Sequence, residues 1–370
     1  MKITVAKRDL ENALSASIGI GTSGSDLSTH YLFRVREGKI EVLSSNLRIF
    51  SSCPLSCQHD GDEGEAFTIE GWRLQKWLSG VGDVAVSFEK DGSEIKASSP
   101  RSKVRMASLD PSKFPYMDKT LAGATEIVGL EADRLATALG FVRMFIDEKG
   151  DENKPAIAQT ESIDGSLWAS DNRSVALVTM PGMEESHLRL HWKDIGSIQK
   201  FLSQRDTGKI TILEHERTTF FLREDGALVG AMRPLVEFPT LTVDRDHQPP
   251  ANWEIRTEDL LSGIQCLSAS ADKDNAWVKF HYDKDADKVI LSVMASAGGE
   301  DSYPLECVSQ ENAEEVPGFW MHHKHLTNIV GHFGKDTLTF GLTKHGKSGY
   351  TTFRHVHQGD LYHSALVWKL

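Results

Sequence analysis

One apolar pattern recurs three times along this chain at a spacing of 125 residues, and it constrains the fold more than any other feature. The recurring positions are pairs of aliphatic residues four apart: Leu10 and Leu14, Leu135 and Leu139, and Leu260 and Ile264. Each pair follows a short alternating segment, which predicts a strand that leads into an amphipathic helix. Polar residues near these helix starts suit capping: Thr4, Glu131 and Thr257. The sequence therefore predicts three copies of one structural unit.

A second apolar face at helical spacing follows later in each copy. Its members are Leu74, Trp77, Leu78 and Val81 in the first copy, Ile198, Phe201 and Leu202 in the second, and Leu326, Ile329, Val330 and Phe333 in the third. Alternating segments then predict three strands per copy: 84–88, 94–98 and 104–107; 210–213, 218–222 and 227–232; 338–342, 350–355 and 364–368. Each copy is thus expected to contain two helices and an antiparallel sheet.

The copies are joined by polar or proline-rich segments around 118–125 and 244–251. A chain of 370 residues is too long for one ordinary core. We predict an α+β fold of three repeated domains, residues 1–121, 125–245 and 251–370. Two helices can cover one face of each sheet, while the sheet edges pair with neighbouring copies. Repeated head-to-tail contacts either close into a ring or continue as a filament, and we favour the closed ring.

Candidate catalytic and cofactor motifs are few. Residues 19–24, Gly-Ile-Gly-Thr-Ser-Gly, match a dinucleotide fingerprint in letters, but they follow a predicted helix instead of a strand, so a glycine-rich helix exit explains them better. The four cysteines, Cys53, Cys57, Cys266 and Cys307, form neither a disulfide framework nor a zinc spacing and are expected to be buried or free thiols. We predict no catalytic residue, no metal and no cofactor.

The histidines near the end of the sequence leave one alternative open. His355 and His357 lie two apart on a predicted strand, so both could point to one face and hold a metal. No carboxylate or cysteine stands at ligand spacing beside them in the sequence. Ordinary surface or core histidines are therefore the favoured interpretation, and a metal-dependent enzyme is the alternative.

The basic residues are informative by position. The net charge of −12 argues against a protein that coats nucleic acid. Even so, cations recur on the predicted helices, where Lys200 is expected to occupy the place of Lys76. If the helices of a ring face inward, these cations would surround a hole suited to a phosphate backbone read by charge alone. The predicted DNA-contacting residues are Lys7, Arg8, Arg73, Lys76, Arg134, Lys193, Lys200 and Lys324.

Several segments, taken together with the repeat, resemble those of bacterial beta sliding clamps over essentially the whole chain. They are Leu-Asp-Pro-Ser-Lys-Phe-Pro at 109–115, Leu-Trp-Ala-Ser-Asp-Asn-Arg at 167–173, Val-Glu-Phe-Pro at 236–239, and the terminal Leu-Val-Trp-Lys-Leu at 366–370. The resemblance implies a head-to-tail homodimer whose six domains form a ring with helices lining a central DNA channel. It also implies a non-catalytic processivity factor, served by a clamp loader and bound to a replicative DNA polymerase. The expected location is the bacterial cytoplasm, or the host cytoplasm if the clamp is phage-encoded, with no membrane partner.

The same resemblance implies two protein-binding sites. A pocket between the second and third domains would bind short partner peptides through Ser170, Asp171, Asn172, Arg173, Val175, Pro239, Leu366, Val367, Trp368, Lys369 and Leu370. Trp368 replaces a residue of the family's Met-Pro-Met segment and would reshape the pocket. The dimer contact would use Val104 and Met106 against Cys266 and Leu267. The alternative that these four residues are core stays open, as does a repeat scaffold without a DNA partner.

Overall fold

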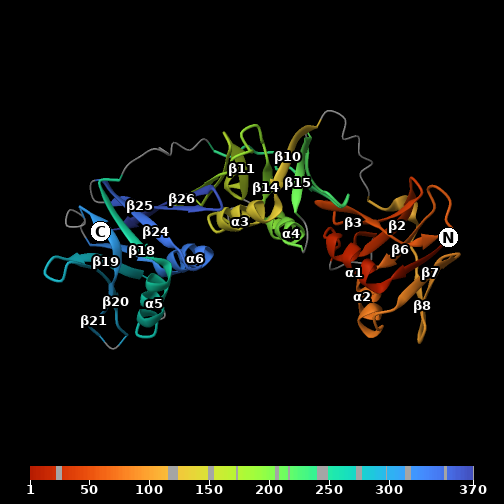
Figure 1. Cartoon of the computed structure of the whole chain (residues 1–370), viewed down its shortest axis with the longest axis horizontal. Helices are drawn as coiled ribbons and strands as arrows, with labels where there is room; N and C mark the ends of the chain where they lie inside the picture. The colour runs from red at the N-terminus through yellow and green to blue at the C-terminus, as the bar shows by residue number, and fades with distance from the viewer. Residues whose placement is uncertain are drawn as a thin grey trace. The chain divides into compact units, whose positions relative to one another are not determined.

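The computed structural model of the chain contains three successive runs of one element order, which Figure 1 colours from red to blue. The structure describes residues 1–21, 27–115, 124–148, 154–171, 174–204, 208–215, 217–239, 249–271, 277–296, 298–312, 318–345 and 348–369. Each run has a strand, a helix, four or five strands, a second helix and three strands. The predicted α+β class and the two helices per copy are confirmed. The domain boundaries drawn from the repeat remain a prediction.

The bounds of the elements follow the three runs. The first contains β1 (Lys2–Ala6), α1 (Lys7–Ala16), β2 (His30–Arg36), β3 (Lys39–Ser45), β4 (Ile49–Leu55), β5 (Gln58–His59), β6 (Ala66–Glu70), α2 (Gly71–Gly80), β7 (Ala85–Asp91), β8 (Glu94–Ser99) and β9 (Ser102–Ala107). The second contains β10 (Thr125–Glu131), α3 (Ala132–Arg143), β11 (Gln159–Ile163), β12 (Ser166–Ser170), β13 (Ser174–Thr179), β14 (Arg189–His191), α4 (Trp192–Leu202), β15 (Lys209–His215), β16 (Thr218–Arg223) and β17 (Leu228–Met232). The third contains β18 (Ala251–Arg256), α5 (Thr257–Ser268), β19 (Trp277–Asp283), β20 (Lys288–Met294), β21 (Glu300–Leu305), β22 (Cys307–Glu311), β23 (Phe319–His322), α6 (His323–Phe333), β24 (Thr337–His345), β25 (Ser348–His357) and β26 (Asp360–Lys369).

The chain divides into two compact units that cut across the repeat. Unit 1 contains residues 1–137 and 188–235, and unit 2 contains residues 138–187 and 236–370. The division has a physical cause, because sheets continue from one copy into another. In unit 1, β17 pairs with β4, and in unit 2, β13 pairs with β26, both antiparallel. The expectation that sheet edges pair with neighbouring copies is thus confirmed.

Unit 1 contains two antiparallel sheets. One has the strand order β5-β1-β7-β8-β9, and the other has the order β10-β15-β16-β17-β4-β3-β2-β6. The helices bury the apolar positions expected from the sequence, including Leu10 on α1 and Leu74 on α2, each 0% exposed. Phe33 stacks on Phe67, with ring centroids 5.1 Å apart, and both residues are 0% exposed.

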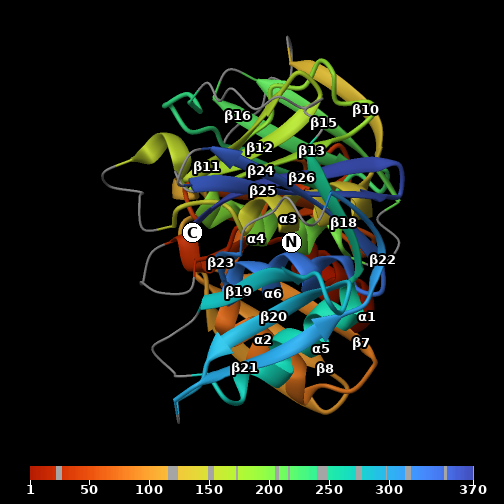
Figure 2. The same ribbon diagram turned by 90° about the vertical axis from the view of Figure 1, so that its left-hand side faces the viewer.

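Unit 2 is organised around long antiparallel hairpins. β24, β25 and β26 pair in succession, and β18 lies between β22 and β24. The meander β19-β20-β21 (Figure 2) joins them through β23, which pairs with both β19 and β26. Trp253 of β18 is 0% exposed, and its ring stacks on those of Phe280 and Phe319 at 6.5 and 6.2 Å.

Two local expectations need correction. Thr4 lies in β1, and α1 begins only at Lys7 with Ala6 at its N-cap, so the hydroxyl of Thr4 does not cap that helix. Thr257 is the first residue of α5, and its hydroxyl donates instead to the carbonyl of Asp336 at 2.9 Å. The two polar residues therefore stand close to helix starts, as read from the sequence, without acting as caps.

The cysteines and the glycine-rich segment follow the predictions. All four cysteines are free, and Cys53 is buried. Gly19 lies after the end of α1, and a Cβ atom there would come within 2.7 Å of the carbonyl oxygen of Ile49, so close packing explains this glycine. Residues 22–24 of the segment lie outside the described part of the chain. Among the described residues, no helix is long and apolar enough to cross a membrane.

Candidate nucleic-acid and partner interfaces

The helices carry cations on their exposed faces. Arg8 on α1, Lys76 on α2, and Lys193 and Lys200 on α4 are all exposed. Lys7 differs, because its Nζ donates to the carbonyl of Val81 at 2.7 Å and its side chain is only 15% exposed. The ammonium of Lys7 is therefore engaged within unit 1, whereas Arg8, Lys76, Lys193 and Lys200 can reach a ligand in solvent.

A tryptophan organises the cations at the start of α2. Trp72 is 54% exposed, and the Arg73 guanidinium lies 5.1 Å and the Lys76 ammonium 5.8 Å from its ring. Arg73 also pairs with Glu70 at 2.5 Å. Cation–π contacts orient a side chain while leaving its charge available, whereas the ion pair partly neutralises Arg73. Lys76 is thus better placed than Arg73 to attract an anion.

The start of α4 repeats this arrangement. The ammonium of Lys193 lies 5.4 Å from the ring of Trp192. The positions of the cations along the helices do not by themselves reveal either tryptophan. An aromatic residue followed within one turn by Lys or Arg was the signal that would have found these pairs.

The proposed equivalence of Lys76 and Lys200 is wrong in register. Lys76 is the sixth residue of α2 and Lys200 is the ninth of α4, so Lys200 lies almost one turn further from its helix start. The two remaining predicted cations lie on other helices. Arg134 is half-buried on α3, and Lys324 is the second residue of α6, with a side chain outside the described part.

A cavity of about 430 Å³ in unit 1 is lined by residues of α1, α2 and α4. Lys200 and Glu11 both line it, so its charges are balanced. Tyr31 also lines it, accepts a hydrogen bond from Gln75 at 3.1 Å, and has a pKa raised by burial despite that bond. A cavity with a neutral phenol and balanced charge does not select phosphate, and we assign it no role in DNA contact.

The structure brings together most of the predicted peptide-binding residues in unit 2. The Ser170 hydroxyl donates to the carbonyl of Ser174 at 2.9 Å, and the Asp171 carboxylate accepts from the amide of Ser174 at 2.7 Å. These bonds shape the turn between β12 and β13. Val175 pairs in register with Ala365 of β26, so the turn lies beside the strand that contains Leu366, Val367, Trp368 and Lys369.

The apolar side of this region is formed by a separate cluster. Trp168, Leu177 and Phe238 are buried together, and Val175 packs against them. The amide of Phe238 donates to Glu161 at 2.9 Å, which fixes the segment that carries the half-buried Pro239. The predicted residues Asn172, Arg173 and Leu370 lie outside the described part of the chain, as do the side chains of 366–369.

The predicted dimer residues divide into two kinds. Met106 and Leu267 are each 4% exposed and belong to the core of their own chain. Val104 is half-buried and Cys266 is exposed. Strand β9, which contains Val104, lies at the edge of its sheet and pairs there with β8. An edge strand offers backbone groups to another chain, so β9 and Cys266 remain the accessible part of the predicted contact.

His355 and His357 do share one face, as the sequence suggested. No carboxylate was found at ligand spacing in the sequence, but the fold brings Asp336 to 3.1 Å from His355 and 3.9 Å from His357. The signal that would have revealed Asp336 is the register of the hairpin formed by β24 and β25. Thr339 pairs with Arg354, and extending that register by three residues places Asp336 opposite His357.

Comparison with known proteins gives a clear result for the fold. No protein-family model and no curated protein matches the chain. The chain is similar to the solved beta subunit of DNA polymerase III from Thermotoga maritima, at 17% identity and a TM-score of 0.83, covering 100% of this chain and 99% of that one. A sliding clamp (DNA polymerase III subunit beta) from Pseudomonas aeruginosa bound to griselimycin gives 11% identity and a TM-score of 0.85, with 100% of both chains covered. The beta subunit from the DNA polymerase of Streptococcus pyogenes gives 11% and 0.83, covering 100% and 99%.

Proposed function

We propose that this chain, which has the fold of the beta subunits of DNA polymerase III over its whole length, is a sliding clamp. In this function it encircles double-stranded DNA as a ring and tethers a replicative polymerase, without catalysing a reaction. The full-length match at TM-scores of 0.83–0.85 carries the proposal, because a partial match would leave room for another architecture. Fold alone does not establish function, so the exposed helix cations and the edge strand supply the site-level support.

The charge distribution supports contact with DNA. The chain has a net charge of −12, yet exposed cations recur on α1, α2 and α4. Such cations contact phosphates independently of sequence, while the overall negative charge opposes wrapping of DNA around the outside. The proposed contacts are Arg8, Arg73, Lys76, Lys193 and Lys200, with Arg134 and Lys324 as further candidates.

The proposed protein partners use two surfaces. A short partner peptide, from the polymerase or the clamp loader, would bind beside the β12–β13 turn and β26, where Val175 and Pro239 offer apolar surface next to the polar turn. A second copy of the chain would add to the edge strand β9 and close a homodimeric ring. This role places the protein in the cytoplasm with the replicating DNA.

The decisive experiment measures retention of the protein on two forms of the same DNA. Separated subunits are mixed with a nicked circle and concentrated, so that rings close around it, and the sample is moved to high salt. We expect the protein to stay on the circle and to leave once the circle is cut, because an enclosing ring can escape only over a free end. Equal retention on circular and linear DNA, or none on either, contradicts the proposal.

Charge-reversed variants test the helix cations in the same assay. Replacing Lys76, Lys193 and Lys200 with Glu should reduce loading on the circle, because repulsion opposes threading of the phosphate backbone. The control reverses three exposed lysines away from the helices, Lys39, Lys284 and Lys288, with the same change in net charge. Equal loading of both triple variants would show that position on the helices has no effect.

A further inference from the structure

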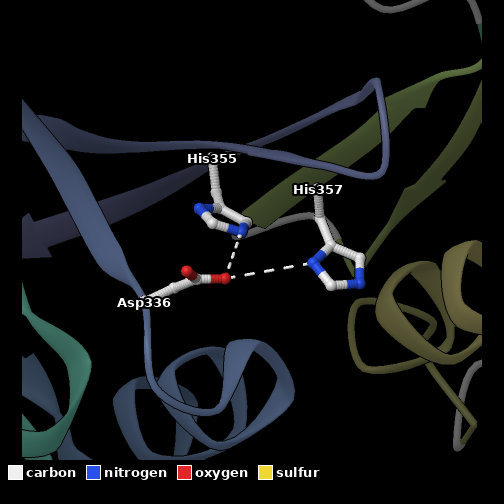
Figure 3. A group of neighbouring side chains, drawn as sticks. All are labelled: Asp336, His355 and His357. Atoms are coloured by element: carbon white, nitrogen blue, oxygen red, sulfur yellow. Dashed lines mark ion pairs between the residues drawn. The ribbon is translucent and has the colours of Figure 1, made fainter.

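We propose that Asp336, His355 and His357 form a binding site for a zinc ion in unit 2. Figure 3 shows the three side chains converging, with both imidazoles directed at one carboxylate oxygen of Asp336. Within the described part of the chain, this is the group whose nitrogen and oxygen atoms lie close enough to share a metal, all within 4.8 Å of one another. The site is independent of the proposed clamp function.

The distances fit the geometry of zinc. Zinc bonds to nitrogen and oxygen are about 2.0–2.1 Å long, and a tetrahedral arrangement then places neighbouring ligand atoms about 3.3 Å apart. Oδ2 of Asp336 lies 3.1 Å from Nε2 of His355 and 3.9 Å from Nδ1 of His357. Small side-chain rotations would bring both separations to the tetrahedral value. Two imidazoles and a carboxylate are a usual zinc ligand set, with water as the fourth ligand.

His355 brings a buried nitrogen atom to the site. The residue is 9% exposed, and its Nε2 atom lies 3.1 Å from the Asp336 oxygen. A metal between the nitrogen and the oxygen would replace this contact and bond to both atoms, because each can direct a lone pair at the ion.

The backbone holds the three ligands before any metal binds. The amide of Asp336 donates to the Thr257 hydroxyl at 2.9 Å, and the amide of Thr257 donates to the carbonyl of Asp336 at 2.8 Å. His355 and His357 are fixed by pairing of β25 with β26, where they lie opposite Tyr362 and Asp360. A site built on paired strands loses little entropy on binding, which favours affinity.

The surroundings favour a structural ion. The ring of Phe333 lies 4.4 Å from that of His355, and the ring of Tyr362 lies 6.4 Å from that of His357. These rings line one side of the site. The ligands connect Asp336, which directly precedes β24, to the end of β25. A bound ion would tie together two segments separated by almost twenty residues and raise the stability of the full chain.

The test is a zinc titration of the chelator-stripped, full-length protein, followed by calorimetry and by elemental analysis after gel filtration. We expect about one zinc ion per wild-type chain, a rise in melting temperature on zinc addition, and a visible tetrahedral spectrum with cobalt as a probe. Asp336→Asn and His357→Ala should each weaken zinc binding by about tenfold or more. Both side chains are partly exposed, at 42% and 38%, so these variants should fold.

Two controls separate this site from others. His281→Ala removes a half-buried histidine from β19 in the same unit, and Cys266→Ser removes an exposed thiol that could bind zinc by itself. Both should bind zinc like the wild type. The proposal is overturned if wild-type protein binds no zinc at micromolar concentration, or if Asp336→Asn and His357→Ala bind it as tightly as the wild type with unchanged melting temperatures in chelator.

Discussion

Protonation of His332 should destabilise the folded chain in mild acid. Burial is the main cause that lowers the pKa of His332 from 6.5 to about 4, with smaller contributions from the charges of His357 and His355. The folded-state pKa lies below that of the unfolded chain, so the unfolded chain binds more protons between about pH 6.5 and pH 4, and stability falls as the pH drops through this window. At pH 4.5 the loss is about 2–3 kcal/mol relative to pH 7.5.

The substitution His332→Phe isolates this effect. The ring of His332 lies 5.4 Å from Phe141 and 5.2 Å from Phe333, so an aromatic replacement suits the cluster and cannot titrate. Thermal unfolding in chelator at pH 7.5 and 4.5 should show a drop that is about 5–10 °C smaller in the variant than in the wild type. The control is His215→Phe at the exposed end of β15, which should leave the pH dependence unchanged. If His332→Phe and the wild type lose the same stability on acidification, burial of a neutral imidazole is not what shapes this response.

Two further predictions concern individual residues of the structure. Arg48 binds Asp194 through two hydrogen bonds of 2.8 and 3.2 Å, and the Asp194 side chain is 3% exposed, so Arg48→Ala should lower the free energy of unfolding by about 1–3 kcal/mol. Urea unfolding would measure this loss, with Arg105→Ala, which breaks a solvent-exposed pair, expected to cost less than about 0.5 kcal/mol. Burial raises the pKa of Cys53 to about 12, so iodoacetamide at pH 8 should label exposed Cys266 in dilute folded protein and leave Cys53 unlabelled, as peptide mass spectrometry would show. Equal labelling would contradict the burial of Cys53, and protection of Cys266 on concentration would support its place in a dimer contact.

The sequence predicted the fold because its periodicity is strong and repeated. The Leu10 and Leu14 pattern recurs without a gap, and the residues expected to face each core are buried except Trp77, which is half-buried. Predicted strands such as 218–222 match the observed β16 (Thr218–Arg223) within a residue. The turn between β16 and β17 contains Asp225 and Gly226, and Gly226 has a positive φ of 84° that a glycine accommodates without strain.

Pairings between distant strands were beyond the reach of periodicity. An alternating segment shows which face is buried, but it does not identify its neighbour across the sheet. The pairing of β17 with β4 and of β13 with β26 therefore appeared only in the structure. Asp336 was missed for a different reason, because its proximity to His355 depends on the register of the hairpin formed by the consecutive strands β24 and β25.

The sequence identifies the cations on the helices, but it does not show which of them are accessible to a ligand. Sequence alone treats Lys7 and Lys76 as equal charges on neighbouring helices. The structure separates them, because Lys7 donates to the carbonyl of Val81 while Lys76 stands exposed beside Trp72. Burial and partner choice come from tertiary packing, and these determine which charge can meet a phosphate.

The small number of accessible cations bears directly on how such a chain could hold DNA. Among the predicted cations whose side chains the structure describes, the exposed ones are Arg8, Arg73, Lys76, Lys193 and Lys200. If all five contacted phosphates, a fourfold rise in salt would weaken the binding of one chain by about 10²–10³-fold. Adhesion of that kind would fail under the conditions of replication, and stronger adhesion would impede sliding. Retention by a closed ring avoids this conflict, because the lifetime of the protein on DNA then depends on the contact between subunits. Strand β9 offers a sheet edge for that contact. The cations then need only keep the duplex near the centre of the ring.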